Sequence, residues 1–245
     1  MNDICVKMEK LSKSFAILER KNTTVQALKL LLKHKPLQST LHVLKDMSCE
    51  IKKGEMIALL GRNGSGKTTL LRILTDIYEK TSGRVYVNGT ARILSKSSFG
   101  LNIHLSVIDN IYLLGAIHGI ERDTLNNKIK DIIMTAGLWD LKFLPLNKLS
   151  AGQVQSLALS VFFQSEGDLF ILDEALEALD FDFINKCDTY CQFLRSTQKT
   201  LIMTSHNSGL LKAFCTKAIW LEDGKIKMQG DFDQINSEYK NSFLK

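Results

Sequence analysis

The eight residues Gly61 to Thr68 constrain this 245-residue chain more than any other stretch. They read Gly-Arg-Asn-Gly-Ser-Gly-Lys-Thr and match the pattern G-x-x-x-x-G-K-[ST], in which glycines let backbone N–H groups surround phosphate oxygens. The apolar run Met56–Leu60 comes before them and predicts a strand, and Thr68–Ile77 after them predicts a helix. A strand, a glycine-rich loop and a helix N-terminus in this order predict a nucleotide phosphate site.

At that site we expect Lys67 to reach the β- and γ-phosphates and the Thr68 hydroxyl to bind Mg²⁺. The whole set of residues expected to bind the nucleotide from this loop is Gly61, Asn63, Gly64, Ser65, Gly66, Lys67, Thr68 and Thr69.

Two more apolar runs end in polar residues. Leu169–Leu172 is followed by Asp173 and Glu174, and Thr200–Thr204 is followed by Ser205 and His206. Short apolar strands that alternate with helices predict a parallel sheet covered on both faces, with its ligands at the carboxyl ends of the strands. We therefore expect Asp173 to hold Mg²⁺ through water, Glu174 to act as general base, and His206 to contact the γ-phosphate.

The remaining segments complete an α/β prediction of one domain over residues 1–245. Residues of about 99–160 are expected to form an inserted helical subdomain, since apolar residues recur there at helical spacing. Ile4–Val6, Val85–Val87 and Ala218–Leu221 are predicted strands of a smaller β layer.

Composition is that of an ordinary globular protein, with 44% hydrophobic residues, 24% charged residues and a net charge of +6. It excludes disordered and low-complexity classes, and the mild charge does not choose between anionic partners. The N-terminus has no apolar segment of a secretory signal, so a cytosolic protein is expected. The five cysteines are scattered, without a C-x-x-C pair, and are expected to be reduced thiols and not metal ligands.

One further motif, Leu149-Ser150-Ala151-Gly152-Gln153, closes the helical region. Taken alone, Ser150 is a helix N-cap. Taken together, the motifs resemble an ABC-type ATPase subunit over nearly the whole chain. Gly61–Thr68 resembles the Walker A loop of that family, and residues 149–153 resemble its signature, with Ala151 in place of the first Gly. Leu169–Glu174 resembles the Walker B motif, Glu177–Asp180 resembles the D-loop, and His206 resembles the switch histidine.

This resemblance implies a P-loop NTPase core of ABC ATPase type with an N-terminal antiparallel β layer, and ATP with Mg²⁺ as cofactors. It also implies a dimer of two copies that hold ATP between them, so that Ser150, Gly152 and Gln153 of one copy bind the nucleotide of the other. Phe15 stands where the family has an aromatic residue that stacks on adenine, and His42 is the alternative for that role.

A finer resemblance is to subunits that export O-antigen, capsule or teichoic acid. It rests on the insertion at residues 16–42, on Ser106–Gly119 with its Asp109-Asn110-Ile111-Tyr112 segment, on Asp180–Cys187, and on Phe214–Lys217 with Ile219–Glu222. It implies a separate membrane subunit, a lipid-linked glycan as cargo, no nucleic acid, and a peripheral location at the cytoplasmic face of the inner membrane. The alternatives are a transporter subunit for another cargo and a soluble ABC ATPase that acts on nucleic acid or ribosomes.

The insertion carries five basic residues, Arg20, Lys21, Lys29, Lys33 and Lys35. Leu28, Leu31 and Leu32 would share one face of a helix there. The segment is expected either to pack as a surface helix on the β layer or to face anionic headgroups or the membrane subunit.

The chain lacks a glutamine that the family resemblance implies. ABC ATPases place a Gln between Walker A and the signature, yet Thr69–Ser150 contains none. Its position falls in Ala91–Gly100, where Ser95, Ser97 and Ser98 are the neutral polar residues. We expect Thr68 and Asp173 to hold Mg²⁺ with a water in the place of the Gln, and the segment Phe99–Asn110 to couple to the membrane subunit. The alternative is that another residue reaches into the site.

Overall fold

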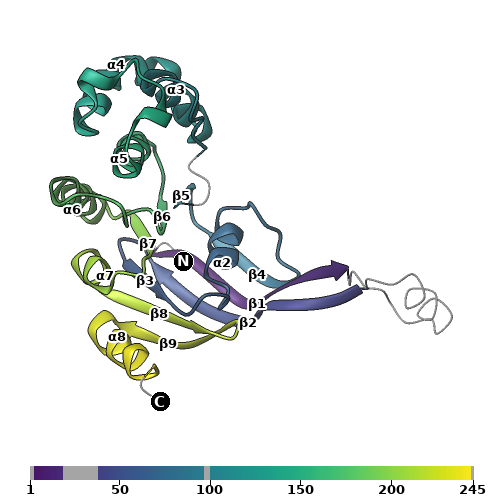
Figure 1. Cartoon of the computed structure of the whole chain (residues 1–245). Coiled ribbons are helices and arrows are strands. Elements are labelled where there is room, and N and C mark those ends of the chain that lie inside the picture. Colours follow the sequence, from purple (N-terminus) through teal and green to yellow (C-terminus); the bar gives the residue numbers. More distant parts are fainter. Residues whose placement is uncertain (1–2, 19–37, 97–99, 244–245) are drawn as a thin grey trace.

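The computed structural model describes residues 3–18, 38–96 and 100–243, and a six-stranded sheet forms its centre (Figure 1). The strands lie in the order β5–β6–β7–β3–β8–β9, parallel except for the last pair. Their bounds are β5 Ala91–Ser95, β6 Leu169–Asp173, β7 Thr200–Thr204, β3 Met56–Leu60, β8 Lys217–Glu222 and β9 Lys225–Asp231. The predicted parallel sheet is thus confirmed, and β7 separates the strand of the phosphate loop from the strand of the acids.

Strands β3, β6 and β7 are buried at every position because helices and the second sheet cover both faces of the central sheet. The side chains of β3 alternate between two cores: Met56, Ala58 and Leu60 pack on one face, and Ile57 and Leu59 on the other. The covering helices are α2 Lys67–Leu74, α6 Phe181–Ser196, α7 Ser208–Phe214 and α8 Phe232–Asn241. All five cysteines are buried free thiols within these cores.

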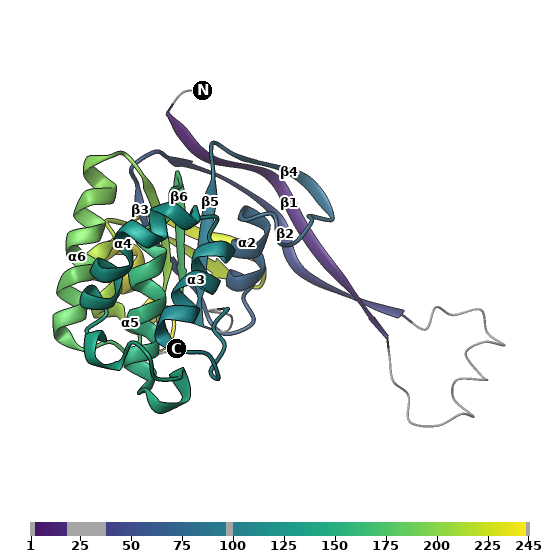
Figure 2. The same cartoon turned by 90° about the horizontal axis from the view of Figure 1, so that it is seen from above.

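A three-stranded antiparallel sheet packs beside this core, in the order β2–β1–β4. Its strands are β1 Ile4–Leu18, β2 Gln38–Lys52 and β4 Ser82–Val87, and the β1–β2 ribbon projects away from the body of the molecule (Figures 1 and 2). The ends of the expected insertion are therefore paired strand, with Ala16 opposite Thr40. The basic and leucine residues of the insertion named above, from Arg20 to Lys35, lie outside the described residues.

The helical subdomain forms a separate lobe above β5 and β6 in Figure 1. It contains α3 Val107–Ile117, α4 Arg122–Thr135, α5 Ala151–Phe162 and two short 3-10 helices, Trp139–Leu141 and Leu146–Lys148. Ser106 begins α3 with a reciprocal capping box to Asp109. The buried amide of Asn110 donates to the carbonyls of three preceding residues, so the Asp109–Tyr112 segment fixes the entry into this lobe. No helix among the described residues combines the length and apolar character needed to cross a bilayer.

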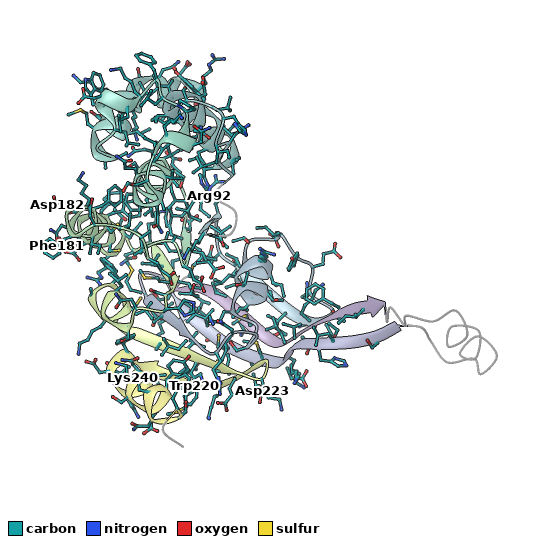
Figure 3. The ribbon with its side chains drawn as sticks, in the orientation of Figure 1. Arg92, Phe181, Asp182, Trp220, Asp223 and Lys240 are labelled. Atoms are coloured by element: carbon teal, nitrogen blue, oxygen red, sulfur yellow. The ribbon has the colours of Figure 1, made fainter. Side chains whose placement is uncertain are left out.

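Two local predictions were wrong, and one strand was not predicted. Ala218–Leu221 belongs to the central sheet as β8, where it pairs in parallel with β3, and not to the smaller layer; its four buried positions are typical of a central strand. The helix after the phosphate loop ends at Leu74 and does not reach Ile77, because Asp76 takes a left-handed φ of 56°. The strand β5 was not expected, since its half-exposed Arg92, labelled in Figure 3, interrupts the apolar pattern.

Candidate nucleotide-binding and hydrolysis site

The loop between β3 and α2 needs its glycines for both backbone conformation and space. Gly64 and Gly66 have left-handed φ values of 81° and 105°. A Cβ on Gly61 would lie 2.5 Å from Ser65 Oγ, and a Cβ on Gly66 would lie 2.6 Å from Leu44 Cδ2. The loop therefore closes tightly on itself and on β2, which leaves its backbone N–H groups around a concave turn at the start of α2.

Two polar groups of this loop fit a phosphate ligand. The Lys67 ammonium donates to the carbonyl oxygens of Gly61, at 2.6 Å, and Arg62, at 3.3 Å. Burial lowers the pKa of Lys67, against the opposing charges of Glu174 and Asp173. The buried Ser65 Oγ has no hydrogen-bond partner within the described part of the chain. A half-buried cation and a buried hydroxyl on a glycine-rich loop are donors that phosphate oxygens can accept.

Asp173 lies at the centre of a hydroxyl cluster at the carboxyl edge of the sheet. It is 5% exposed and accepts hydrogen bonds from the hydroxyls of Thr204 at 2.7 Å, Thr68 at 3.3 Å and Ser95 at 3.3 Å. Ser95 and Thr204 stand directly opposite Asp173 on the two neighbouring strands. A carboxylate next to the first-turn threonine of α2 supplies the oxygen ligands that Mg²⁺ binds, so the residues fit the expected metal.

Glu174 and His206 form a pair beside this cluster. His206 Nε2 lies 3.1 Å from Glu174 Oε1, with side chains that are 60% and 34% exposed. Glu174 has a left-handed φ of 55°, and its N–H donates to both oxygens of Thr204. Such a conformation costs on the order of 1–3 kcal/mol in a non-glycine residue, so surrounding bonds must hold it. Glu174 lines the same cavity as Gly61 and Lys67 of the nucleotide loop.

A cavity of about 310 Å³ lies between the phosphate loop and the Glu174–His206 pair. It is lined by Lys67, Glu174 and His206, and also by Tyr239 of the C-terminal helix α8 and by Phe243 just after it. Gly61 of the phosphate loop also lines this cavity, and the Tyr239 ring packs edge-on against Trp220 at 5.4 Å. Figure 3 labels Trp220 of β8 and Lys240 of α8, and Lys240 also lines the cavity. The sequence did not predict that α8 would contribute to the site.

Sequence reasoning also missed an ion pair at this edge. Lys96, the residue after β5, places its ammonium 2.8 Å from Glu177 Oε2, and Glu177 Oε1 accepts the backbone N–H of His206 at 3.2 Å. Burial would raise the pKa of Glu177, but the hydrogen bonds from Lys96 and from the His206 N–H outweigh it and hold the pKa below its usual value. A prediction of strand β5 could have revealed this ion pair, because Lys96 follows that strand and therefore lies at the carboxyl edge of the sheet.

The signature residues lie at the start of α5. Ser150 is the N-cap of this helix, in a capping box with Gln153, and a Cβ on Gly152 would lie 2.7 Å from the carbonyl oxygen of Ala178. Gln155, which was not predicted, donates to the carbonyl of Ala175 and accepts the N–H of Ala178 at 2.9 Å. Among the hydrogen bonds and ion pairs of the described residues, none joins these side chains to the phosphate loop.

The two candidates for adenine stacking stand on neighbouring strands of the ribbon. The half-buried Phe15 ring packs edge-on against Tyr78 at 5.6 Å, with the Lys13 ammonium 4.7 Å from its centroid. The exposed His42 shares a hydrogen bond of 2.8 Å with Ser14 Oγ. Val43 and Leu44, next to His42, contact the phosphate loop at Gly66. Both assignments stay predictions.

Comparison with known proteins places the site in a family. Residues 44–177 match the family model described as "ABC transporter". The chain is 30% identical over 239 residues to the teichoic acids export ATP-binding protein TagH of Lactococcus lactis, covering 98% of this chain and 51% of that protein. It is 33% identical over 204 residues to TagH of Bacillus anthracis, covering 83% and 37%. The chain thus spans about half of these curated relatives or less.

A solved structure of the ATP-binding cassette MJ0796, described as the dimeric post-hydrolysis state bound to ADP and Pi, superposes with a TM-score of 0.74. The identity is 20%, with coverage of 93% of this chain and 98% of that one, so this likeness speaks for the fold. The family match spans more than half of the chain and contains the phosphate loop, the signature segment and both acids. The chain therefore belongs to the ABC transporter family and has the fold of its ATP-binding cassettes.

Proposed function

We propose that this chain is the ATP-hydrolysing subunit of an exporter that moves a lipid-linked polysaccharide of the O-antigen, capsule or teichoic acid kind across the cytoplasmic membrane. The observation that carries the hydrolytic part is the convergence of Lys67, Asp173, Glu174 and His206 at one edge of the central sheet. The cargo class is supported by the names of the curated relatives, which match most of the chain at 28–33% identity.

In the proposed reaction Lys67 leaves its carbonyl partners in the loop and neutralises the β- and γ-phosphates of ATP. Thr68 and Asp173 would hold Mg²⁺, which when bound neutralises charge on the phosphate oxygens. Glu174 accepts a proton from the attacking water. His206, now 3.1 Å from Glu174, is placed to orient that carboxylate and to donate to the γ-phosphate.

The proposal includes two partners. A second copy of the chain would supply Ser150, Gly152 and Gln153 to the nucleotide of the first, and the dimeric state described for the MJ0796 cassette supports this arrangement. A separate membrane subunit would convert closure of the dimer into movement of the glycan. The chain would then lie at the cytoplasmic face of the inner membrane, held there through that subunit.

Hydrolysis is tested by Glu174→Gln in the purified chain. Loss of a general base lowers turnover by about 10²–10⁴-fold, and ATP binding should persist because the lysine and the loop remain. Glu166→Gln, at an exposed glutamate outside the site, is the matched control and should keep the parent rate. A Glu174→Gln rate within about threefold of the parent would exclude Glu174 as the base.

The cargo is tested in the source cell by exchanging the chromosomal copy for Glu174→Gln. Lipid-linked glycan should then accumulate inside while surface polysaccharide decreases. Unchanged surface polysaccharide, together with an active purified parent, would reject the glycan cargo and leave the ATPase assignment intact.

A further inference from the structure

The connection from β5 to the helical subdomain carries a charge where the family resemblance implies a neutral Gln. Lys96 is the last described residue of that connection before residue 100, and its side chain is half-exposed. Its ammonium is nevertheless fixed 2.8 Å from Glu177 Oε2, a carboxylate whose side chain is only 18% exposed. A pair with one largely buried member loses less to solvent than a fully exposed pair does.

Glu177 links this pair to both groups of the hydrolytic site. Its second oxygen, Oε1, accepts the backbone N–H of His206 at 3.2 Å, and His206 Nε2 in turn lies 3.1 Å from Glu174. One carboxylate oxygen of Glu174, one of Glu177 and one ring nitrogen of His206 all lie within 4.8 Å of one another. Two carboxylates this close repel each other, and the Lys96 ammonium contacts one of them, Glu177, from the side of β5.

These contacts form a continuous line. Lys96 forms an ion pair with Glu177, Glu177 accepts the backbone N–H of His206, and the imidazole of His206 contacts Glu174. The Asp173 cluster lies next to this line, since Ser95 precedes Lys96 and donates to Asp173. Glu177 also lies in the segment between Ala175 and Ala178 that the buried Gln155 of α5 fixes. The line therefore starts at the entry to the helical subdomain and ends at the expected base.

We propose that Lys96 is a positioning residue for hydrolysis, which sets the geometry of the Glu174–His206 pair through Glu177 from the connection where the family resemblance implies a Gln. This inference rests on the proposed ATPase reaction. Lys96 touches neither substrate nor reacting atoms in this role, so its loss should affect the rate of hydrolysis and not the binding of ATP.

The test compares kcat and KM for ATP in four variants of the purified chain. Lys96→Met and Glu177→Gln, both close in shape to the parent residues, should each lower kcat about tenfold and leave KM within about twofold, since loss of transition-state geometry alone changes kcat. The double variant should be no slower than either single variant, because both remove the same contact. Lys96→Arg should keep most of the parent rate.

Lys212→Met is the matched control, because Lys212 forms an ion pair of 2.7 Å with Asp233 on the exposed surface. Its kcat should equal that of the parent. A Lys96→Met kcat within twofold of the parent, additive losses in the double variant, or a raised KM at unchanged kcat would each overturn the proposal. Failure of the proposed reaction itself is distinguished by Glu174→Gln: if that variant hydrolyses ATP like the parent, the ATPase assignment to Glu174 falls, and not only the role of Lys96.

Discussion

Among single residues, Ser95 shows how one hydroxyl can affect the expected metal site, because it lies beside the carboxylate of Asp173. Ser95 is 6% exposed and ends β5, in the stretch where the family resemblance implies a Gln side chain. A serine is too short to copy the reach of a Gln amide, yet its contact with Asp173 at 3.3 Å orients an expected ligand of Mg²⁺. Ser97 and Ser98, the other candidates, lie outside the described residues.

Ser95→Ala should therefore lower the ATPase rate about tenfold at saturating Mg²⁺, the loss of one hydrogen bond to a charged group. Ser165→Ala is the control, since it removes a buried hydroxyl that donates to Phe162 O, outside the site, and should keep the parent rate. The measurement is the rate as a function of Mg²⁺ concentration. A hundredfold loss with a raised requirement for Mg²⁺ would contradict our expectation of a water in the Gln's place and make Ser95 a direct ligand.

Residues at the same edge differed in how far the sequence could predict them. Lys67, Thr68, Asp173 and Glu174 were found because each belongs to a short motif whose chemistry is set by neighbours in the chain. Lys96 was not singled out, and Glu177 was named only as the first residue of the segment that resembles a D-loop. Their ion pair was missed because the two residues are 81 positions apart in the chain. Their pairing depends on which strands stand side by side, and periodicity does not encode strand order.

At the element scale, the start of α5 and the segment 174–180 behave as one unit. Gly152 leaves room for the carbonyl of Ala178, and the amide of Gln155, 2% exposed, satisfies a carbonyl and an N–H of that segment. The signature motif and the expected catalytic glutamate are thus held together within one chain. The N-terminal part of α5, which carries the signature, therefore also fixes the segment 174–180, in addition to its proposed contact with a nucleotide.

Gln155→Leu should destabilise the protein by about 2 kcal/mol, because it leaves two backbone groups without partners at similar side-chain volume. For a chain of this size that corresponds to a fall of about 5 °C in Tm. Gln192→Leu makes the same change at an exposed position of α6 and should alter stability by less than about 0.5 kcal/mol. Equal melting temperatures for Gln155→Leu and the parent would show that the segment 174–180 does not depend on this amide.

Elements were predicted better than the sheets that contain them. The strands at 56–60, 169–172 and 200–204 were expected from unbroken apolar runs, and the helical subdomain from its periodicity. Ala218–Leu221 was correctly expected to be a strand but was assigned to the wrong sheet, because its partner β3 lies about 160 residues earlier in the chain. The pairing of β8 with β3 brings Tyr239 of α8, which packs on Trp220 of β8, to the cavity beside the phosphate loop.

At the scale of the whole molecule, the hydrogen bonds and ion pairs of the described residues include none between the phosphate loop and the signature motif of one copy. Ser150 is exposed at the first turn of α5, where N–H groups and the helix dipole favour an anion. The proposed dimer explains why the two motifs are separate in one copy, since the signature of one copy can then contact the phosphates bound by the other. Each active site would be built from two chains.

Ser150→Asp tests the dimer, because aspartate caps a helix as well as serine does while its charge repels the γ-phosphate. The variant should keep the stability of the parent within about 0.5 kcal/mol and lose ATPase activity. Lys67→Ala should be inactive for a different reason, the lost contact with phosphate. Mixed together, the two inactive proteins should recover about a quarter of the parent rate, because half of random dimers are mixed and each mixed dimer contains one unaltered site. Titration of one variant into the other measures this recovery, and a mixture as inactive as its components would mean that the signature does not act on the nucleotide of a second copy.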